Sequence, residues 1–178
     1  RAEGPQSLAR AFFEANDEGP LAGSLDLIFA REGRPTDRDA LPFQVFDGER
    51  LVPVGEYLAA NPRPELLRLE ARLEALAAGP YGHRAGDVML LSRSGAELAL
   101  EERFYFSALY RSWHGSPRAS DSHVPLVVAR RGSDGAAIRR RVERGLGPTE
   151  PDESGTRWHS QRGITPLIVS LLSGEPSR

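Results

Sequence analysis

The chain has 178 residues, with 23 basic side chains against 25 acidic ones, which gives a formal net charge of −2. All of the basic residues are arginine, and the sequence contains neither lysine nor cysteine. These absences exclude a Walker-type phosphate loop, a Schiff-base lysine, a cysteine nucleophile, a cysteine zinc site and a disulfide. The near-neutral charge does not indicate a nucleic-acid-binding domain, because such domains are usually strongly basic. The longest apolar stretch, residues 164–172, is far shorter than the ~20 residues of a membrane span.

The beginning of the chain predicts a helix followed by a strand. Apolar residues at helical spacing favour a helix over residues 8–16, which a polar turn ending in Gly19-Pro20 stops. The run over residues 24–30 then places Leu25, Leu27 and Phe29 in alternation around Asp26 and Ile28. We interpret this run as a largely buried strand.

A hairpin is predicted next. Two extended runs, residues 43–46 and 50–54, flank Asp47-Gly48, and Asp-Gly between such runs is the strongest short hairpin signal. Pro53 weakens the second strand as a hydrogen-bonding partner. We therefore expect the hairpin at a sheet edge or in an inserted flap.

The middle of the chain predicts a helix and a second strand. Residues 64–78 carry a leucine stripe at helical spacing, and Gly79-Pro80 ends this amphipathic helix. The stripe consists of Leu66, Leu69, Leu73 and Leu76. We interpret it as core rather than as a partner surface, because two heptads are too few for a coiled coil. Residues 86–91 follow as a buried strand.

The C-terminal part predicts a strand, two helices and a long polar connection. Residues 124–129 are expected to form a strand, residues 134–144 a surface helix, and residues 145–163 a loop. The last helix is expected to begin with Thr165 as N-cap and to end at Gly174. Strands that alternate with helices favour an α/β fold with a mainly parallel sheet.

The densest polar cluster spans residues 110–123, directly before the predicted strand 124–129. Three interpretations of it stay open. Ser116, Asp121 and either His114 or His123 supply the residue types of a hydrolytic triad, although no G-x-S-x-G elbow is present. His114 could instead hydrogen-bond within its loop as a structural residue. In the third interpretation His114 is a metal ligand, since neutral imidazole suits Zn²⁺.

Four segments together resemble the C-terminal half of the alkaline phosphatase superfamily, near its bacterial nucleotide pyrophosphatase/phosphodiesterase branch. They are GDVMLL (86–91), YRSWHGS (110–116), DSHVPLVV (121–128) and ITPLIVSLL (164–172). In that family a histidine-glycine pair in a loop carries the last metal ligand, a V-P strand follows, and a helix that opens with Thr-Pro leads to the C-terminus. The similarity covers most of residues 24–172, and the order and spacing of the segments are its most specific feature.

The resemblance implies a fold and a single site residue. The fold would be part of a three-layer α/β/α sandwich with a mainly parallel sheet. Residues 1–178 would form one domain, the C-terminal portion of a catalytic domain, with an inserted hairpin-plus-helix cap segment over about residues 40–80. His114, followed by Gly115, matches the position of the metal ligand.

The resemblance also implies a reaction class. The family uses two divalent metal ions, for which we expect Zn²⁺, together with a Thr or Ser nucleophile, and it hydrolyses phosphate esters and related compounds. An Asp-His-Gly motif and most ligands would precede Leu8 and are absent from this sequence. We therefore expect a fragment that is inactive alone, belonging to a protein with a phosphate-ester substrate. Many relatives are exported, so a periplasmic or secreted location is expected by resemblance only.

Several neighbours of His114 are weaker candidates within the same picture. Asp121 is close enough in sequence to accept a hydrogen bond from the second ring nitrogen of His114. His123 could line the pocket, and Tyr110, Arg111 and Trp113 could contact a substrate. The alternative from a different class is a non-catalytic α/β binding or structural domain that shares the scaffold.

Overall fold

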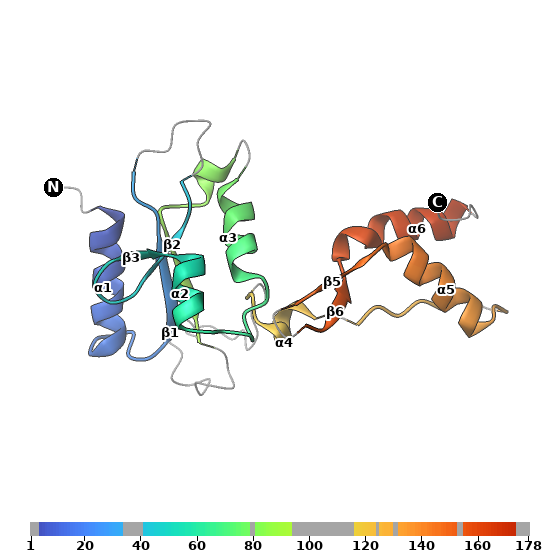
Figure 1. The fold of residues 1–178 in the computed structure, drawn as a ribbon, viewed down its shortest axis with the longest axis horizontal. Helices are drawn as coiled ribbons and strands as arrows, with labels where there is room; N and C mark the ends of the chain where they lie inside the picture. The colour runs from blue at the N-terminus through green and yellow to red at the C-terminus, as the bar shows by residue number, and fades with distance from the viewer. Residues whose placement is uncertain are drawn as a thin grey trace. The chain divides into compact units, whose positions relative to one another are not determined.

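The structure is a computed structural model that describes residues 4–33, 41–78, 81–93, 116–123, 125–129, 132–152 and 155–173. The chain divides into two compact units, unit 1 (Arg1–Asp121) and unit 2 (Ser122–Arg178) (Figure 1). His114 and the other candidates among residues 110–115 lie outside the described ranges. The assignment of the whole chain to one domain, with a cap-like insertion over about residues 40–80, stays a prediction.

Unit 1 is built on a four-stranded sheet in the order β3-β2-β1-β4, in which every neighbouring pair is antiparallel. The strands are β1 (Leu25–Ala30), β2 (Gln44–Phe46), β3 (Leu51–Pro53) and β4 (Val88–Ser92). The prediction of an α/β/α sandwich built on a mainly parallel sheet is therefore wrong in the direction of its strands. The prediction took each helix between two strands as the crossover connection that joins parallel strands. Here two helices lie between β3 and β4, and β4 runs opposite to β3.

Helices cover both faces of this sheet (Figure 1). On one face α1 (Pro5–Asp17) supplies Ala9 to a buried cluster. On the other face α2 (Val54–Ala60) and α3 (Leu69–Ala77) pack over a larger cluster, and the short 3₁₀ helix η1 (Gly82–Arg84) follows. The larger cluster consists of Leu27, Phe29, Phe43, Val45, Val54, Leu66, Leu69, Leu73, Ala77 and Leu91. The core of unit 1 thus lies mainly between the sheet and α2 and α3.

The predicted helix over residues 64–78 is only partly correct. The α-helix begins at Leu69, after Arg68 in the left-handed region at φ 53°, and α2 was not predicted. Leu66 instead forms an isolated antiparallel β-bridge with Arg118. Leu76 is 49% exposed although the stripe placed it in the core. Tertiary contacts of the first residues thus decide where this helix starts. The predicted helix over residues 8–16 and the largely buried strand over residues 24–30 are confirmed by α1 and β1. The strand predicted over residues 86–91 is confirmed by β4, but only Leu91 in it is buried.

The hairpin at Asp47-Gly48 is confirmed, and β3 lies at the edge of the sheet as expected. The Asp47 carboxylate accepts hydrogen bonds from the backbone N–H groups of Glu49 and Arg50, each at 2.8 Å. Gly48 has φ 107°, and a Cβ there would approach Phe13 to 3.0 Å. The turn therefore needs glycine both for its backbone conformation and for its contact with α1.

The charge of Asp47 should make the stability of the hairpin depend on pH. The backbone hydrogen bonds from Arg50 and then Glu49 lower the pKa of this carboxyl below its ordinary value of 3.8. Its stabilising contribution is present above that value and is lost as the pH falls through the lower folded pKa. We expect Asp47→Asn to lower the free energy of unfolding at neutral pH. Urea denaturation of both proteins should show the difference shrinking in acid, and a difference that stays constant would contradict this origin.

Unit 2 contains two helices and a two-stranded antiparallel sheet. α5 (Gly135–Leu146) confirms the predicted surface helix, and Asp134 caps it by accepting from the N–H of Ala137 at 2.8 Å. The remaining elements are β5 (Thr149–Pro151), β6 (Arg157–His159), the 3₁₀ helix η3 (Gln161–Gly163) and α6 (Ile164–Ser173). α4 (Ala119–Ser122) is a single turn that spans the boundary of the two units.

Three predictions for the C-terminal part are wrong. Residues 125–129 have no regular secondary structure, so the predicted strand over residues 124–129 is absent from the described part of that segment. Residues 145–163 contain the hairpin β5–β6 rather than a loop; its strand residues lack an apolar alternation that could signal it. Thr165 lies inside α6 rather than capping it, because η3 leads directly into the helix.

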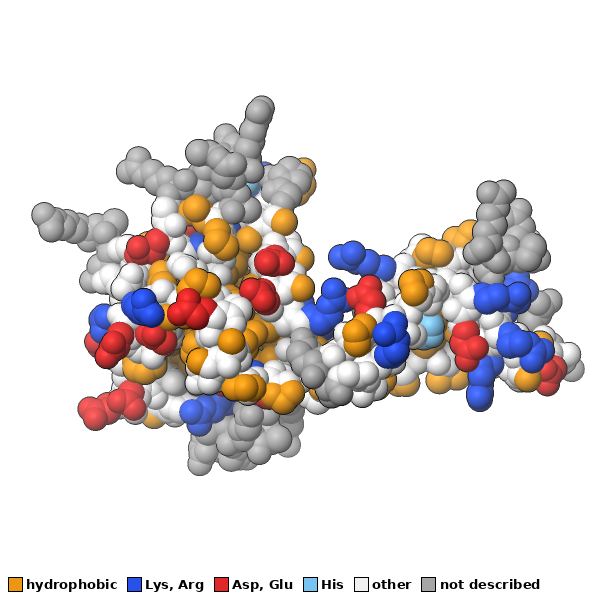
Figure 2. Space-filling model, viewed as in Figure 1, with side chains coloured by type: hydrophobic (Ala, Val, Ile, Leu, Met, Phe, Trp, Pro, Cys, Tyr) orange, Lys and Arg blue, Asp and Glu red, His pale blue; other side chains and the backbone are white. Residues whose placement is uncertain are grey.

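Within the described ranges, no helix has the length and apolar character needed to cross a bilayer. Charged side chains of both signs are spread over the face of unit 1 in Figure 2, and arginines gather over unit 2. The sequence of α5 contains Arg139, Arg140, Arg141 and Arg144. Arg139, Arg140 and Arg144 are exposed, whereas Arg141 is half-buried and donates to the backbone carbonyl of Ser170 in α6 at 2.6 Å.

Candidate functional site

Residues 116–123 are the described residues closest to His114 in the sequence. Three backbone contacts dock the start of this segment onto the loop before α3. Leu66 forms a β-bridge with Arg118, the N–H of Leu67 donates to the carbonyl of Pro117 at 2.8 Å, and the N–H of Ala119 donates to the carbonyl of Glu65 at 2.9 Å. Residues 117–119 are therefore held against the loop before α3 in unit 1.

A cluster of four charged side chains reinforces this docking, and we call it the charge cluster. It consists of Asp26, Arg63, Glu65 and Arg118. Arg63 holds the Asp26 carboxylate with both terminal nitrogens, at 2.9 and 2.7 Å, and donates from Nε to Glu65. Arg118 donates to the same carboxylate at 2.5 Å. The two positive and two negative charges balance, so the cluster is neutral as a whole.

Asp26 reaches both arginines because β1 is irregular at this residue. The pairing of β1 with β4 shifts register between Leu25 and Leu27, which marks a β-bulge at Asp26. Bulges re-aim side chains, and here Leu25 joins the cluster on the α1 face while Leu27 joins the opposite one. The Asp26 side chain is 12% exposed and that of Arg118 is 6% exposed. A largely, but not fully, buried aspartate in an otherwise apolar strand thus has two cationic partners.

The pKa values within the charge cluster follow from these contacts. The hydrogen bond to Asp26 raises the pKa of Arg63 above its ordinary value, although burial opposes this shift. Burial works to raise the pKa of the Glu65 carboxyl, but the hydrogen bond from Arg63 and the charges of Arg63 and Arg118 outweigh it. The pKa of Glu65 consequently lies below its ordinary value, and both groups are ionised at neutral pH.

The residues of the possible triad do not come together as a triad in the described segment. Ser116 donates its hydroxyl hydrogen bond directly to Asp121, with no imidazole between the two. His123 instead stacks on Trp158 of β6, with ring centroids 3.7 Å apart. Trp158 in turn donates from its indole nitrogen to Asp152 at 2.7 Å. His123 is therefore a packing residue of unit 2 in this structure.

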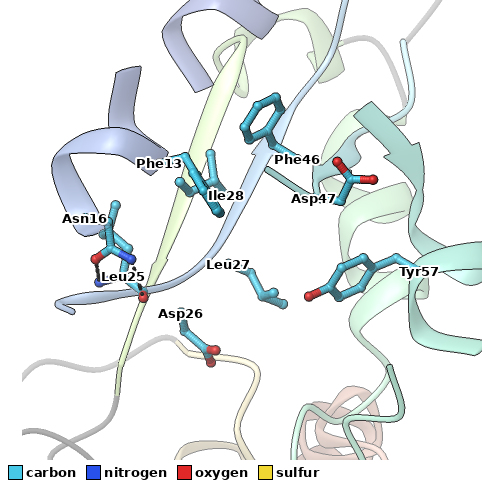
Figure 3. Close-up of a pocket in the computed structure, with 9 residues that line it drawn as sticks. All are labelled: Phe13, Asn16, Leu25, Asp26, Leu27, Ile28, Phe46, Asp47 and Tyr57. Carbon is cyan, nitrogen blue, oxygen red and sulfur yellow. Dashed lines mark hydrogen bonds between the residues drawn. The ribbon is translucent and has the colours of Figure 1, made fainter. Parts of the chain in front are cut away.

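A small cavity lies beside β1, next to the charge cluster (Figure 3). Its lining combines apolar side chains with Asn16, Asp26, Asp47 and Tyr57. The Asn16 side chain fills one end by pairing with the backbone N–H and C=O of Leu25 at 2.7 and 3.2 Å. The volume is about 80 Å³, enough for a few water molecules but below the roughly 300 Å³ typical of ligand pockets.

No metal site is complete within the described part of the chain. No group of three or more His, Cys, Asp or Glu side chains comes together there in a way that could hold a metal ion. His83 lies in η1 and His159 in β6, where its Nδ1 is 3.0 Å from the carbonyl of Gly147. A metal bound through His114 would need its other ligands from elsewhere.

These features define an α/β protein whose main unit is a four-stranded antiparallel sheet with a partly buried charge cluster at one strand. No protein-family model, curated protein or solved structure matches the chain.

Sequence reasoning missed the charge cluster, although one signal for it was present. Asp26 is the single charged residue in an otherwise apolar strand, and such a residue needs a partner once it is buried. Which partner it finds is decided by folding, since Arg63 and Arg118 lie 37 and 92 residues away. No local pattern marks those two arginines among 23.

Proposed function

We propose that this chain is the C-terminal part of a metal-dependent phosphoesterase, in which His114 is one ligand of a centre of two divalent metal ions, with Zn²⁺ as the expected metal. The proposal rests on the order of the four segments that resemble the alkaline phosphatase superfamily. One structural observation supports it: the segment that follows His114-Gly115 is anchored to β1 through the Arg118–Asp26 pair. A metal ligand needs a fixed support of this kind, because a site loses function when its geometry is looser by about 1 Å.

The described residues contain no group that could complete a metal site, and His114 is the one ligand that the resemblance assigns to this chain. When bound, a pair of divalent ions activates a nucleophile and clamps the attacking and leaving oxygens of phosphoryl transfer. The described residues that follow His114 in the sequence, Pro117 to Ala119, are bound to the loop before α3. Asp121 is tied by Ser116 to the segment directly after that loop, and it is a candidate acceptor for the second ring nitrogen of His114. The substrate class is a phosphate ester.

The rival function is a non-catalytic α/β binding or structural domain. The antiparallel sheet favours it, because the fold differs from the mainly parallel sheet that the resemblance implies. The two functions predict different effects of replacing His114 on the hydrolysis of phosphate esters. A phosphoesterase depends on His114 for turnover, whereas a binding domain hydrolyses no phosphate ester with or without it.

Hydrolysis by the full-length gene product tests the proposal. We expect turnover of p-nitrophenyl phosphate or bis(p-nitrophenyl) phosphate in the presence of zinc. His114→Ala should reduce it by more than the about 100-fold that loss of an outer-shell partner of a metal can cost. His159→Ala, at an exposed histidine of unit 2, is the matched control and should retain turnover. Unchanged hydrolysis in His114→Ala, or a full-length chain with neither activity nor further ligands, would overturn the proposal.

A further inference from the structure

We infer that residues 116–121 form a strap that opens without unfolding the sheet of unit 1, and that the pair of Arg118 with Asp26 is the latch that keeps it closed. The strap is the last segment of unit 1, because unit 2 begins at Ser122. The strap and its latch lie wholly within the described residues, and their role is independent of the proposed function.

The strap contributes no large apolar side chain to unit 1. Its sequence is SPRASD, and none of its residues belongs to either buried apolar cluster. Its backbone is bound to the loop before α3 by the β-bridge of Arg118 with Leu66 and by two hydrogen bonds, at 2.8 and 2.9 Å. Burial of apolar surface, the dominant favourable contribution to folding, therefore adds little to the closed state of the strap.

The latch is the most buried contact of the strap. Arg118 is 5% exposed, whereas Ser120 and Asp121 after it are exposed. The Nη2 atom of Arg118 donates to Oδ2 of Asp26 at 2.5 Å. A hydrogen bond between two charged groups is roughly twice as strong as one between neutral groups. The latch therefore contributes more to closure than either backbone hydrogen bond of the strap.

The sheet keeps its own contacts when the strap opens. Arg63 holds the Asp26 carboxylate with two hydrogen bonds, at 2.9 and 2.7 Å, and it belongs to the loop before α3 rather than to the strap. Asp26 therefore retains a cationic partner after Arg118 has moved into water, so opening leaves no buried charge unpaired in β1. Segments held in this way open locally, at a lower free energy than the core of a sheet.

An open strap changes unit 1 at two places. It uncovers the side of the Asp26 carboxylate that binds Arg118, and this residue also lines the small cavity beside β1 (Figure 3). It also adds the residues of the strap to the connection that leads into unit 2, because the strap ends at the unit boundary. The latch thus controls both the exposure of Asp26 and the length of this connection.

Native-state hydrogen exchange of the full-length gene product, followed residue by residue, tests the inference. The N–H groups of Leu67 and Ala119 form the two hydrogen bonds of the strap, and the N–H of Arg31 bonds the end of β1 to the residue before β4 at 3.0 Å. The two strap amides should be less protected than the Arg31 amide and should respond less to low concentrations of urea, because local opening exposes little surface. Equal protection with an equal urea dependence would overturn the inference.

A variant of the latch gives the second test. Arg118→Gln should lower the protection of both strap amides about tenfold or more, as loss of a hydrogen bond to a charged group does, and should leave the Arg31 amide unchanged. Arg118→Lys keeps a charged donor and should recover part of the protection. Arg50→Gln is the matched control, because the Arg50 side chain is 70% exposed and its pair with Glu56 is 3.9 Å long.

The outcomes for these variants are decisive in either direction. A loss of protection confined to the strap amides in Arg118→Gln, with none in Arg50→Gln, supports the latch. An equal loss in the strap and sheet amides would contradict it, and so would no loss in either. An Arg118→Gln variant that does not fold would also contradict the inference, because the pair would then hold the sheet itself.

Discussion

Asp26→Ala should lower the free energy of unfolding of unit 1 by about 3–5 kcal/mol, the usual cost of breaking a buried ion pair by removing one partner. The variant leaves the guanidinium of Arg118 buried without the carboxylate that it binds at 2.5 Å, and it takes away the bidentate partner of Arg63. Urea denaturation followed by far-ultraviolet circular dichroism measures the loss.

A matched acid on the surface provides the control for this prediction. Glu56 lies 3.9 Å from Arg50, and both side chains are more than half exposed, at 63% and 70%. Exposed pairs contribute about 0–1 kcal/mol, so Glu56→Ala should change stability little. If Asp26→Ala cost no more than Glu56→Ala, the charge cluster would not be the buried network that the contacts indicate.

Phe29→Ala should lower the free energy of unfolding by about 3–5 kcal/mol, as large-to-small changes of buried aromatic residues do. Phe29 is 1% exposed on the central strand β1, where it belongs to the larger cluster between the sheet and α2 and α3. The residues around the resulting cavity lie on β2 and α3. Because these residues belong to a strand and a helix, they cannot easily move to fill the cavity. The same denaturation experiment measures this loss.

Phe13 supplies the comparison for the core prediction. It stands on α1 with 38% of its surface exposed and meets Phe46 edge-on at 5.7 Å. Phe13→Ala removes the same number of atoms, but it should lower the free energy of unfolding by less, because solvent already reaches the ring. Equal losses for Phe29→Ala and Phe13→Ala would show that the sheet core is not where the structure places it.

Most elements of unit 1 could be predicted from the sequence, because the residues that determine each of them are adjacent in the chain. The turn at Asp47-Gly48 depends on two adjacent residues, and the apolar run of β1 is continuous in the sequence. The pairing direction could not be obtained in this way. Whether the chain returns parallel or antiparallel after β3 depends on how α2 and α3 lie on the sheet, and the sequence did not even separate α2 from its surroundings.

The bulge at Asp26 shows a second limit of the sequence. Strict alternation placed Leu25 and Leu27 on one face, and the register shift puts them on opposite faces. The same irregularity turns Asp26 toward Arg63 and Arg118. The candidate site is therefore only partly readable from sequence. The segment around His114 is marked by its residue pattern, whereas the contact of Arg118 with Asp26 on β1 joins residues 92 positions apart.

The central claim is that His114 holds a metal ion, and the zinc content of the full-length gene product tests it most directly. After equilibration with zinc and removal of free metal, mass spectrometry should find about two zinc ions per wild-type chain, as a two-metal centre requires. His159→Ala should retain them, and His114→Ala should lose at least one. Equal zinc content in His114→Ala and the wild type would contradict the claim, and so would a wild-type protein that retains no zinc.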